Sequence, residues 1–489
     1  MLTLTDLLAI EEDLQVLEFA FEHDDFLMWP LIRAYVLLEA LYAEYGLKNA
    51  HAHSGHLSLQ ELASYVATTV RENPFRDASP RSIVMFSSGI TNVQRGDTYF
   101  NRLHDHFALE LQQDTLIIED SVRRHYLRPR RFQPVRSHDW IHIQGAFGAR
   151  LTRLSSRDRA NTLGLIRYLK AHFPHNFEPS FWDAVQAMLV ERGKRLNAQH
   201  KCYDALFERL RPRVVFVEDG SYGVRSYVFK WARARGIATA ELQHGLVSLN
   251  HPAYNYASAL AQSPRYRQHL PEFFLTCGRY WKEQVRMPSP PLVIGNPNLS
   301  EYTKDAAALQ REKGKTVILI VSGGGVPQLL GSITLDLRGL LSPSHYDIVF
   351  RPHPGEIPMV TERYDQLGRS GIRIDLSTDL YESICQSHVV AGEMSTALFE
   401  ALAFAKPVFA LDNEYGRLQF AGNLFPRFKD AKELGELVGG KSTVIYPDVG
   451  YIWESDWRSR YSEFISEVKS GQSPRSDLKP AKSSVGGGA

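Results

Sequence analysis

Two motifs in the C-terminal half of the chain combine residue types that bind phosphate. Ser322-Gly323-Gly324-Gly325 follows the apolar run TVILIV, and its glycines would let backbone N–H groups approach a phosphate closely. Arg351-Pro352-His353-Pro354-Gly355-Glu356 follows the run YDIVF, and its two prolines stiffen a turn that carries a guanidinium and an imidazole. Such cations would stabilise a departing diphosphate. The alternatives are a plain flexible turn for the first motif and a structural turn, with His353 capping a neighbouring loop, for the second.

A third motif, Gly392-Glu393-Met394-Ser395-Thr396-Ala397, leads into the helical run LFEALAFA. Ser395 and Thr396 stand where they would cap that helix and present hydroxyl and N–H groups to a phosphate. Glu400, one turn onward, would accept hydrogen bonds from ribose hydroxyls. Simple N-capping is the alternative. Together the three motifs predict a donor-nucleotide site made of Ser322, Gly323, Gly324, Arg351, His353, Glu356, Ser395, Thr396 and Glu400.

In the first half of the chain, the run VVFVEDGSYG places Glu218 and Asp219 at the end of a predicted strand. A carboxylate there would serve as general base toward an acceptor hydroxyl, or as nucleophile. The alternative is an Asp that makes a local turn before a glycine. His244, in Gln243-His244-Gly245 after the next strand, would orient Asp219 or contact the donor phosphate, unless it is an ordinary loop histidine. We therefore predict Asp219, Glu218 and His244 as catalytic residues.

The segment 121–138 carries six arginines and no acidic residue. It would suit an anionic acceptor, a lipid diphosphate or a membrane face, although a solvated loop is the commoner use of such a run. Little aromatic interleaving accompanies it, so nucleic acid is not indicated as a partner.

Alternating strands and helices must position these motifs. SIVMF, TLIIED, VVFVED, IATAELQ and FFLTCG are short apolar runs separated by turns and helical stretches, and a second cycle comprises TVILIV, YDIVF, HVVAG and PVFAL. This alternation predicts parallel, doubly wound sheets, which bind ligands beyond the carboxyl ends of their strands. At 489 residues the chain exceeds what a single core sustains. The predicted division is a helical N-terminal extension (1–80), an N-terminal Rossmann-like acceptor domain (81–295), a C-terminal Rossmann-like donor domain (296–468) and a disordered tail (469–489).

Composition narrows the class of protein further. The net charge is +1, so no global field indicates nucleic acid or membrane. The three cysteines form no CxxC pair, which argues against a disulfide framework or zinc site and favours a reducing compartment. The start, MLTLTDLLAIEEDL, lacks the pattern of a secretory signal. The run from Phe26 to Leu38 is too short to span a bilayer and predicts a buried helix with Pro30 in its first turn. We expect a cytoplasmic protein that works at the inner face of the inner membrane.

In this order, QHG (243–245), VIGNP (293–297), RPHP (351–354) and GEMSTALFEALAFAKPV (392–408) resemble motifs of bacterial capsule and lipopolysaccharide glycosyltransferases of the GT-B fold. The likeness is greatest to capsule polysaccharide biosynthesis proteins, including transferases of 3-deoxy-D-manno-oct-2-ulosonic acid (Kdo), and covers about residues 80–420. It implies two Rossmann-like domains facing a cleft, with the donor in the C-terminal one. It also implies that His353, Ser395 and Thr396 hold the donor phosphate and that Asp219 is the candidate nucleophile.

The resemblance is not complete. Arg225-Ser226 lies farther from the Glu218-Asp219-Gly220 turn than in Kdo transferases, and Glu393 and Glu400 are one residue closer together than the paired glutamates of many GT-B enzymes. Donor sugar and stereochemical outcome therefore stay open.

The resulting hypothesis is a glycosyltransferase that moves a sugar from a CMP-Kdo-like or UDP-linked donor to a bacterial surface polysaccharide or glycolipid. No acidic pair suited to a metal-dependent site stands near the motifs, so we expect neither a metal nor a cofactor. Three alternatives remain: a glycerol- or ribitol-phosphate transferase of the teichoic-acid type, a non-hydrolysing nucleotide-sugar epimerase, and a non-catalytic scaffold with the same fold.

Overall fold

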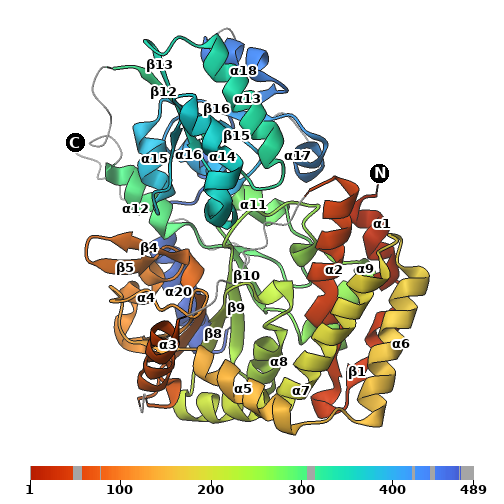
Figure 1. The fold of residues 1–489 in the computed structure, drawn as a ribbon. Helices are drawn as coiled ribbons and strands as arrows, with labels where there is room; N and C mark the ends of the chain where they lie inside the picture. Colours follow the sequence, from red (N-terminus) through yellow and green to blue (C-terminus); the bar gives the residue numbers. More distant parts are fainter. Residues whose placement is uncertain are drawn as a thin grey trace, which may run out of the picture.

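The computed structural model describes residues 2–47, 58–76, 79–305, 314–420, 424–440, 446–472 and 474. Within these ranges the chain forms two parallel β-sheets, each covered by helices on both faces (Figure 1). This confirms the predicted α/β class with two Rossmann-like, doubly wound units. Most of the predicted tail, residue 473 and residues 475–489, lies outside the described residues.

The first sheet has seven strands in the order β11-β10-β9-β8-β3-β6-β7. The order reverses between β3 and β8, so the crevice at their carboxyl ends is the topological switch point. Every pairing in the sheet is parallel. The strands are β3 (Ile83–Ser88), β6 (Thr115–Asp120), β7 (Val135–Ser137), β8 (Val214–Val217), β9 (Ala238–Leu242), β10 (Phe273–Thr276) and β11 (Leu292–Val293).

The second sheet has six strands in the order β14-β13-β12-β15-β16-β17, again all parallel, with its switch point between β12 and β15. Its continuous apolar strands are buried on both faces: Val317, Leu319 and Val321 face one core, while Ile318 and Ile320 face the other. The strands are β12 (Thr316–Val321), β13 (Tyr346–Arg351), β14 (Arg373–Ile374), β15 (Val389–Gly392), β16 (Val408–Leu411) and β17 (Arg427–Phe428).

Helices fill the crossovers between strands. Those of the first unit are α4 (Asp105–Glu110), α5 (Asp139–Leu151), α6 (Ser156–His172), α7 (Pro179–Leu210), α8 (Ser226–Ala234), α9 (Ser258–Gln262), α10 (Pro264–Arg267) and α11 (Arg279–Glu283). Those that follow are α12 (Pro297–Asp305), α13 (Pro327–Leu340), α14 (Val360–Arg369), α15 (Leu380–Gln386), α16 (Thr396–Ala403), α17 (Glu414–Gln419), α18 (Ala431–Val438), α19 (Val449–Ile452) and α20 (Trp457–Lys469). Among the described residues no helix is long and apolar enough to cross a membrane.

The N-terminal segment packs into the first unit instead of standing apart from it. It contains α1 (Leu4–Leu8), the two-residue strands β1 (Ala20–Phe21) and β2 (Phe26–Leu27), α2 (Trp29–Glu44) and α3 (Leu59–Arg71). Helix α2 starts with Pro30 in its first turn, as predicted, and its apolar side chains join the core of the first sheet. A hairpin of β4 (Asn92–Arg95) and β5 (Thr98–Asn101) follows β3.

The last helix, α20, returns to the first sheet (Figure 1). We expected the C-terminal domain to continue to residue 468, but Trp457, Tyr461 and Phe464 pack against the face of the first sheet that carries Met85 and Phe216. Helix α20 packs there because the apolar side chains on that face would otherwise be more exposed to water. The chain therefore crosses between the two units twice.

Candidate functional site

The predicted acidic turn follows β8 at the switch point of the first sheet. Asp219 adopts a left-handed backbone conformation with φ 58°, which Asp tolerates better than most residues. Its Oδ1 lies 3.1 Å from His244 Nε2, and the two side chains are 45% and 22% exposed. The Tyr254 hydroxyl lies 3.4 Å from His244 Nδ1. The structure thus brings Asp219 and His244 together, as the sequence predicted, and adds Tyr254 behind them.

Glu218 points the other way, into the sheet. Its carboxylate accepts hydrogen bonds from the backbone N–H of Ser88 at 2.6 Å and the Ser87 hydroxyl at 3.2 Å. Burial, and next the charge of Asp219, raise the pKa of Glu218 to about 8. This side chain therefore supports the crevice between β3 and β8 and does not face a substrate.

A cavity lies between the carboxyl ends of the two sheets. The first unit contributes His244, and the second contributes Thr396 and Glu400, so three predicted residues from distant parts of the chain meet here. The polar lining residues also include Arg102, Gln243, Asn296, Asn298 and Tyr381. Ligand sites of enzymes often lie at such an interface between two domains.

Helix α16 begins at this cavity. Ser395 is its N-cap residue, but its side chain makes no capping hydrogen bond. In the part of the chain that the structure describes, Ser395 Oγ is buried without a hydrogen-bond partner. The helix start offers backbone N–H groups and a partial positive charge, which together favour an anion. The structure therefore leaves at this point an unused hydroxyl beside a helix terminus.

Glu400 lies one turn along α16, buried at the cavity wall. Its carboxylate accepts a hydrogen bond of 2.8 Å from the Tyr381 hydroxyl. Burial raises its pKa, and the positive charge of Arg102 opposes that shift. A carboxylate thus lies at the cavity wall, and its predicted role toward ribose hydroxyls stays a prediction.

The glycine loop after β12 binds the side-chain carboxylate of Glu393. Backbone N–H groups of Gly323, Gly325 and Val326 donate to the Glu393 carboxylate at 2.9, 3.3 and 3.0 Å. Ser322 is buried, and its hydroxyl accepts from the N–H of Gly324 at 3.1 Å. The loop geometry is the one expected for an anion, but Glu393 takes the place where a phosphate was predicted.

The polar side chains of the Arg351–Glu356 turn bond mostly to other residues of the second unit. The Arg351 guanidinium donates to Asp375 and to Ser377 and Ser383, at 2.8–2.9 Å. Asp375 and Ser377 follow β14 and Ser383 lies on α15, and none of the three lines the cavity between the two sheets.

Glu356 is buried and also serves the turn, accepting from the backbone N–H of His353 at 2.8 Å and the Tyr364 hydroxyl at 2.7 Å. Only His353 reaches a cavity, a second one of about 760 Å³ that it shares with Gly323, Gly324 and Tyr415. Burial lowers the pKa of His353 and keeps the ring neutral near pH 7.

The arginine-rich segment 121–138 is structural in part. Arg130 is fully buried and ion-paired to Asp105 and Glu119. Arg128 bridges Glu119, at 2.8 Å, and Glu72, at 2.6 Å. Arg123, Arg124 and Arg131 are exposed. Two of the six arginines that suggested an anionic partner are therefore neutralised inside the molecule.

Arg102 and Tyr381 line the main cavity but were not predicted. Arg102 directly follows the β4–β5 hairpin, and Tyr381 lies in α15, so neither stands in a motif at the end of a core strand. Asn296 also lines the cavity. It belongs to the VIGNP motif, which follows a short apolar run, and that position after a strand could have indicated a site residue.

Neither a protein-family model nor a curated protein sequence matches this chain. Among solved structures, the UDP-GlcNAc 2-epimerase of Methanocaldococcus jannaschii, in complex with UDP-GlcNAc and UDP, superposes with a TM-score of 0.46 at 11% identity, over 78% of this chain and 99% of that one. The Neisseria meningitidis UDP-GlcNAc 2-epimerase gives 0.43 at 13% identity, over 79% and 99%. The wall teichoic acid polymerase TagF gives 0.41 at 12% identity, over 84% and 93%.

Proposed function

We propose that the chain is a glycosyltransferase that uses a nucleotide-sugar donor. The observation that carries the proposal is the cavity between the two sheets, where His244 of the first unit faces Thr396 and Glu400 of the second. Catalytic transfer between two bound substrates needs contributions from both sides of such a cleft, and a cleft also excludes the water that would hydrolyse the donor.

The donor nucleotide would bind at the start of α16. Its phosphate would accept from the N–H groups of the first turn and from the Ser395 hydroxyl, which has no other partner among the described residues. The Glu400 carboxylate, fixed by Tyr381, would accept from the ribose. A CMP- or UDP-linked sugar fits this arrangement, and neither a cofactor nor a metal is needed for it.

The acceptor hydroxyl would be activated by Asp219. If His244 Nδ1 accepts from Tyr254, Nε2 carries the proton at 3.1 Å from Asp219 Oδ1, and a small rotation of the ring would let it donate there. The other carboxylate oxygen of Asp219 is then available to take the acceptor proton. The same oxygen would act as nucleophile if the sugar configuration is retained.

The acceptor class is a bacterial surface polysaccharide or a lipid-linked glycan, met at the cytoplasmic face of the inner membrane. Two helices support membrane contact. Leu59, Leu62, Val66 and Val70 lie at helical spacing on α3 and are exposed, as are Ile143, Phe147 and Leu151 on α5. Arg150 and Arg153 beside them are also exposed, and they match an anionic lipid surface.

The test combines ligand binding with transfer. Purified protein is first screened by thermal shift against CMP, CDP, UDP, GDP and TDP, because a ligand at a hundred times its dissociation constant adds about 2.7 kcal/mol. With a nucleotide sugar of the stabilising base, Asp219→Asn should lower transfer about 10²–10⁴-fold and leave nucleotide affinity unchanged. Asp204→Asn, on the surface of α7, is the matched control and should leave both unchanged.

Several outcomes would contradict the proposal. Full transfer by Asp219→Asn would remove Asp219 from the chemistry. Turnover of the nucleotide sugar without acceptor would indicate an epimerase, and a phosphodiester product would indicate a glycerol- or ribitol-phosphate transferase. The absence of stabilisation by every nucleotide would favour a non-catalytic scaffold.

A further inference from the structure

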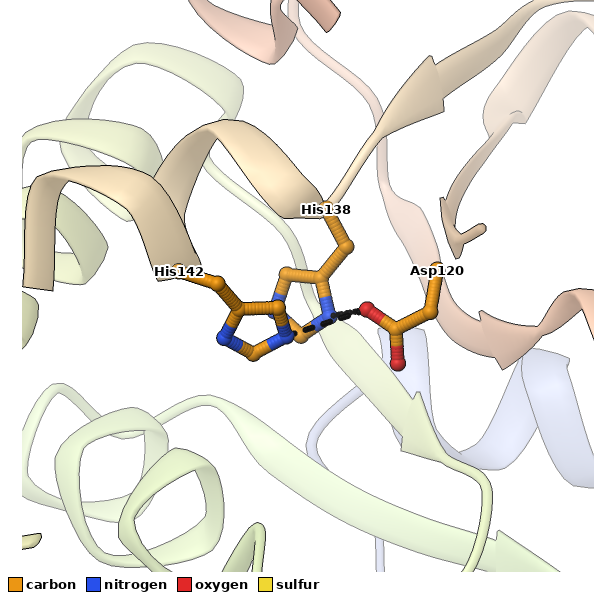
Figure 2. Close-up of side chains that lie close together, drawn as sticks. All are labelled: Asp120, His138 and His142. Carbon is orange, nitrogen blue, oxygen red and sulfur yellow. Dashed lines mark hydrogen bonds and ion pairs between the residues drawn. The ribbon is translucent and has the colours of Figure 1, made fainter. Parts of the chain in front are cut away.

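Three side chains with metal-ligating atoms converge at the carboxyl edge of the first sheet, beyond β6 and β7 (Figure 2). Asp120 is the last residue of β6, His138 caps α5 directly after β7, and His142 lies one helical turn further on. Asp120 Oδ1 is 2.8 Å from His138 Nδ1 and 3.0 Å from His142 Nε2. Parallel strands end at one edge of a sheet, and the spacing of four residues places both imidazoles on one face of α5.

His138 is the most informative member because it is completely buried. Its Nδ1 lies close to Asp120 but makes no hydrogen bond of acceptable geometry with any described residue. Its Nε2 lies 2.5 Å from the Tyr203 hydroxyl, which in turn hydrogen-bonds Tyr227. A ring that donates from Nε2 to Tyr203 keeps the lone pair of Nδ1 pointed at Asp120 and His142. Leaving such a nitrogen unpaired in a core costs free energy that a bound ion would recover.

The carboxylate of Asp120 is also oriented so that one oxygen can ligate an ion. Arg225 forms an ion pair with Oδ2, while Oδ1 faces the two imidazoles. An arginine paired with the other oxygen fixes the orientation of a ligating carboxylate. Glu218 and Asp219 are the other acids that interact with Arg225. Because Glu218 has a raised pKa, Asp219 is the one whose negative charge balances part of the positive charge that an ion would add beside Arg225.

We propose that Asp120 Oδ1, His138 Nδ1 and His142 Nε2 bind one divalent first-row transition-metal ion. Two imidazoles and one carboxylate are a ligand set suited to zinc or iron(II) and poorly suited to calcium or magnesium. Ligand atoms about 2.1 Å from a tetrahedral ion lie about 3.4 Å apart. The observed separations of 2.8 and 3.0 Å therefore need an opening of about half an ångström.

The site is reachable from solvent. His142 is 33% exposed and lines a cavity of about 790 Å³ together with Val224 and Tyr227. A water or another small ligand would complete the coordination from that side. Arg225 also donates from its other nitrogen to the carbonyl of Glu218 at 2.9 Å, so a bound ion would anchor the acidic turn that carries Asp219. The proposal goes beyond the transferase function, which does not require a metal.

The test uses the full-length, untagged protein after treatment with a chelator, and Zn²⁺ and Co²⁺ chloride as probes. We expect one equivalent of Zn²⁺ to bind with a rise in melting temperature, and Co²⁺ to give the visible absorption of a four- or five-coordinate ion. His142→Ala should weaken Zn²⁺ binding at least about tenfold and abolish the Co²⁺ band. The side chain is partly exposed, so this variant should fold, which circular dichroism checks.

His172→Ala is the matched control, because His172 is an exposed histidine on α6 whose Nδ1 lies 2.9 Å from a carbonyl of its own helix. It should bind Zn²⁺ as the wild type does. Two results would overturn the proposal: no saturable binding of either ion by the wild type, or equal binding by His142→Ala and wild type, which would place the ion elsewhere. Both are independent of transferase activity and of its failure.

Discussion

At the scale of single residues, the adjacent acids Glu218 and Asp219 point in different directions just after β8. Glu218 turns into the sheet and hydrogen-bonds Ser88, whereas Asp219 turns toward His244. Successive side chains leave a strand on opposite sides, so one of the two acids had to be buried. The sequence predicted that an acid would stand at this edge. Which of the two faces the cleft depended on the register of β8 in the sheet, which the sequence does not reveal.

Glu241 provides a prediction about pH. It is buried in β9 and accepts from the N–H and hydroxyl of Ser221, and burial raises its pKa to about 8, above the ordinary value of 4.5. The folded state therefore keeps a proton that the unfolded state releases, so this stabilisation is complete below about pH 4.5 and is lost as the pH rises through 8. Over that window one such group lowers the free energy of unfolding by about 1.4 kcal/mol per pH unit.

The measurement is urea unfolding at several pH values between 5 and 8.5. Glu241→Gln keeps an acceptor for Ser221 but cannot titrate, so its stability should fall less steeply with pH than that of the wild type. Glu191→Gln, at an exposed position on α7, is the control and should keep the wild-type slope. Equal slopes for Glu241→Gln and wild type would show that Glu241 is ionised in the folded state.

Arg351 illustrates what sequence motifs leave out. Its position at the end of β13 was predicted correctly, and so was its partner type, an anion. The anion is Asp375, which lies 24 positions along the chain and reaches Arg351 only because β14 pairs with β13. In the same way Glu393 fills the glycine loop because β15 lies beside β12. A motif shows which groups could bind an anion. Which anion binds depends on the neighbouring strand, which places Asp375 beside Arg351 and Glu393 beside the glycine loop.

At the scale of elements, α16 and α18 of the second unit begin in different ways, although each has a residue type that commonly caps helices at its N-cap position. Helix α18 has a conventional cap: the Asp430 side chain accepts from the N–H of Glu433 at 2.9 Å. Ser395, the corresponding residue of α16, makes no such bond. The Ser395 hydroxyl is therefore available to a ligand, whereas the Asp430 carboxylate is already bonded within its helix.

Ser395→Ala should change the free energy of unfolding by less than about 0.5 kcal/mol, because no capping bond is lost. It should weaken binding of the stabilising nucleotide at least about tenfold, the worth of one hydrogen bond to a charged group. Asp430→Ala should do the reverse, costing about 1 kcal/mol of stability and leaving nucleotide affinity unchanged. Urea unfolding and nucleotide titration decide between them. Equal destabilisation by both variants would mean that Ser395 is a structural cap.

The elements themselves were the most predictable level. Every strand expected from an apolar run is present, because buried parallel strands carry continuous β-branched sequences that helices rarely share. The role of α20 was not predictable in this way. Its amphipathic pattern shows that one face is buried, but nothing in that pattern says which sheet it covers.

At the scale of the whole molecule, the exposed side chains of α3 and α5 predict binding to anionic membranes. Replacing Phe147 and Leu151 together by Ser should lower cosedimentation with phosphatidylglycerol vesicles at least about tenfold, because each apolar side chain contributes about 1.5–3 kcal/mol when buried. Raising the salt concentration should weaken binding by the wild type as well.

Leu340→Ser is the control for this experiment, because Leu340 is an exposed apolar residue on α13 of the second unit. It should bind vesicles as the wild type does. Unchanged binding by the Phe147 and Leu151 variant would remove α5 from any membrane contact, and loss of binding with Leu340→Ser would move the contact to the other unit.

The return of α20 to the first sheet also bears on how the chain is made in the cell. The last strand of that sheet ends at Val293, but the helix that covers one of its faces ends at Lys469. At a ribosomal rate of 5–20 residues per second, the intervening chain takes about 10–35 s to synthesise. During that interval α4 contributes to the cover of Met85 and Phe216, but α20 does not yet exist. Nascent chains of this protein would therefore expose part of an apolar surface to chaperones until α20 has been synthesised.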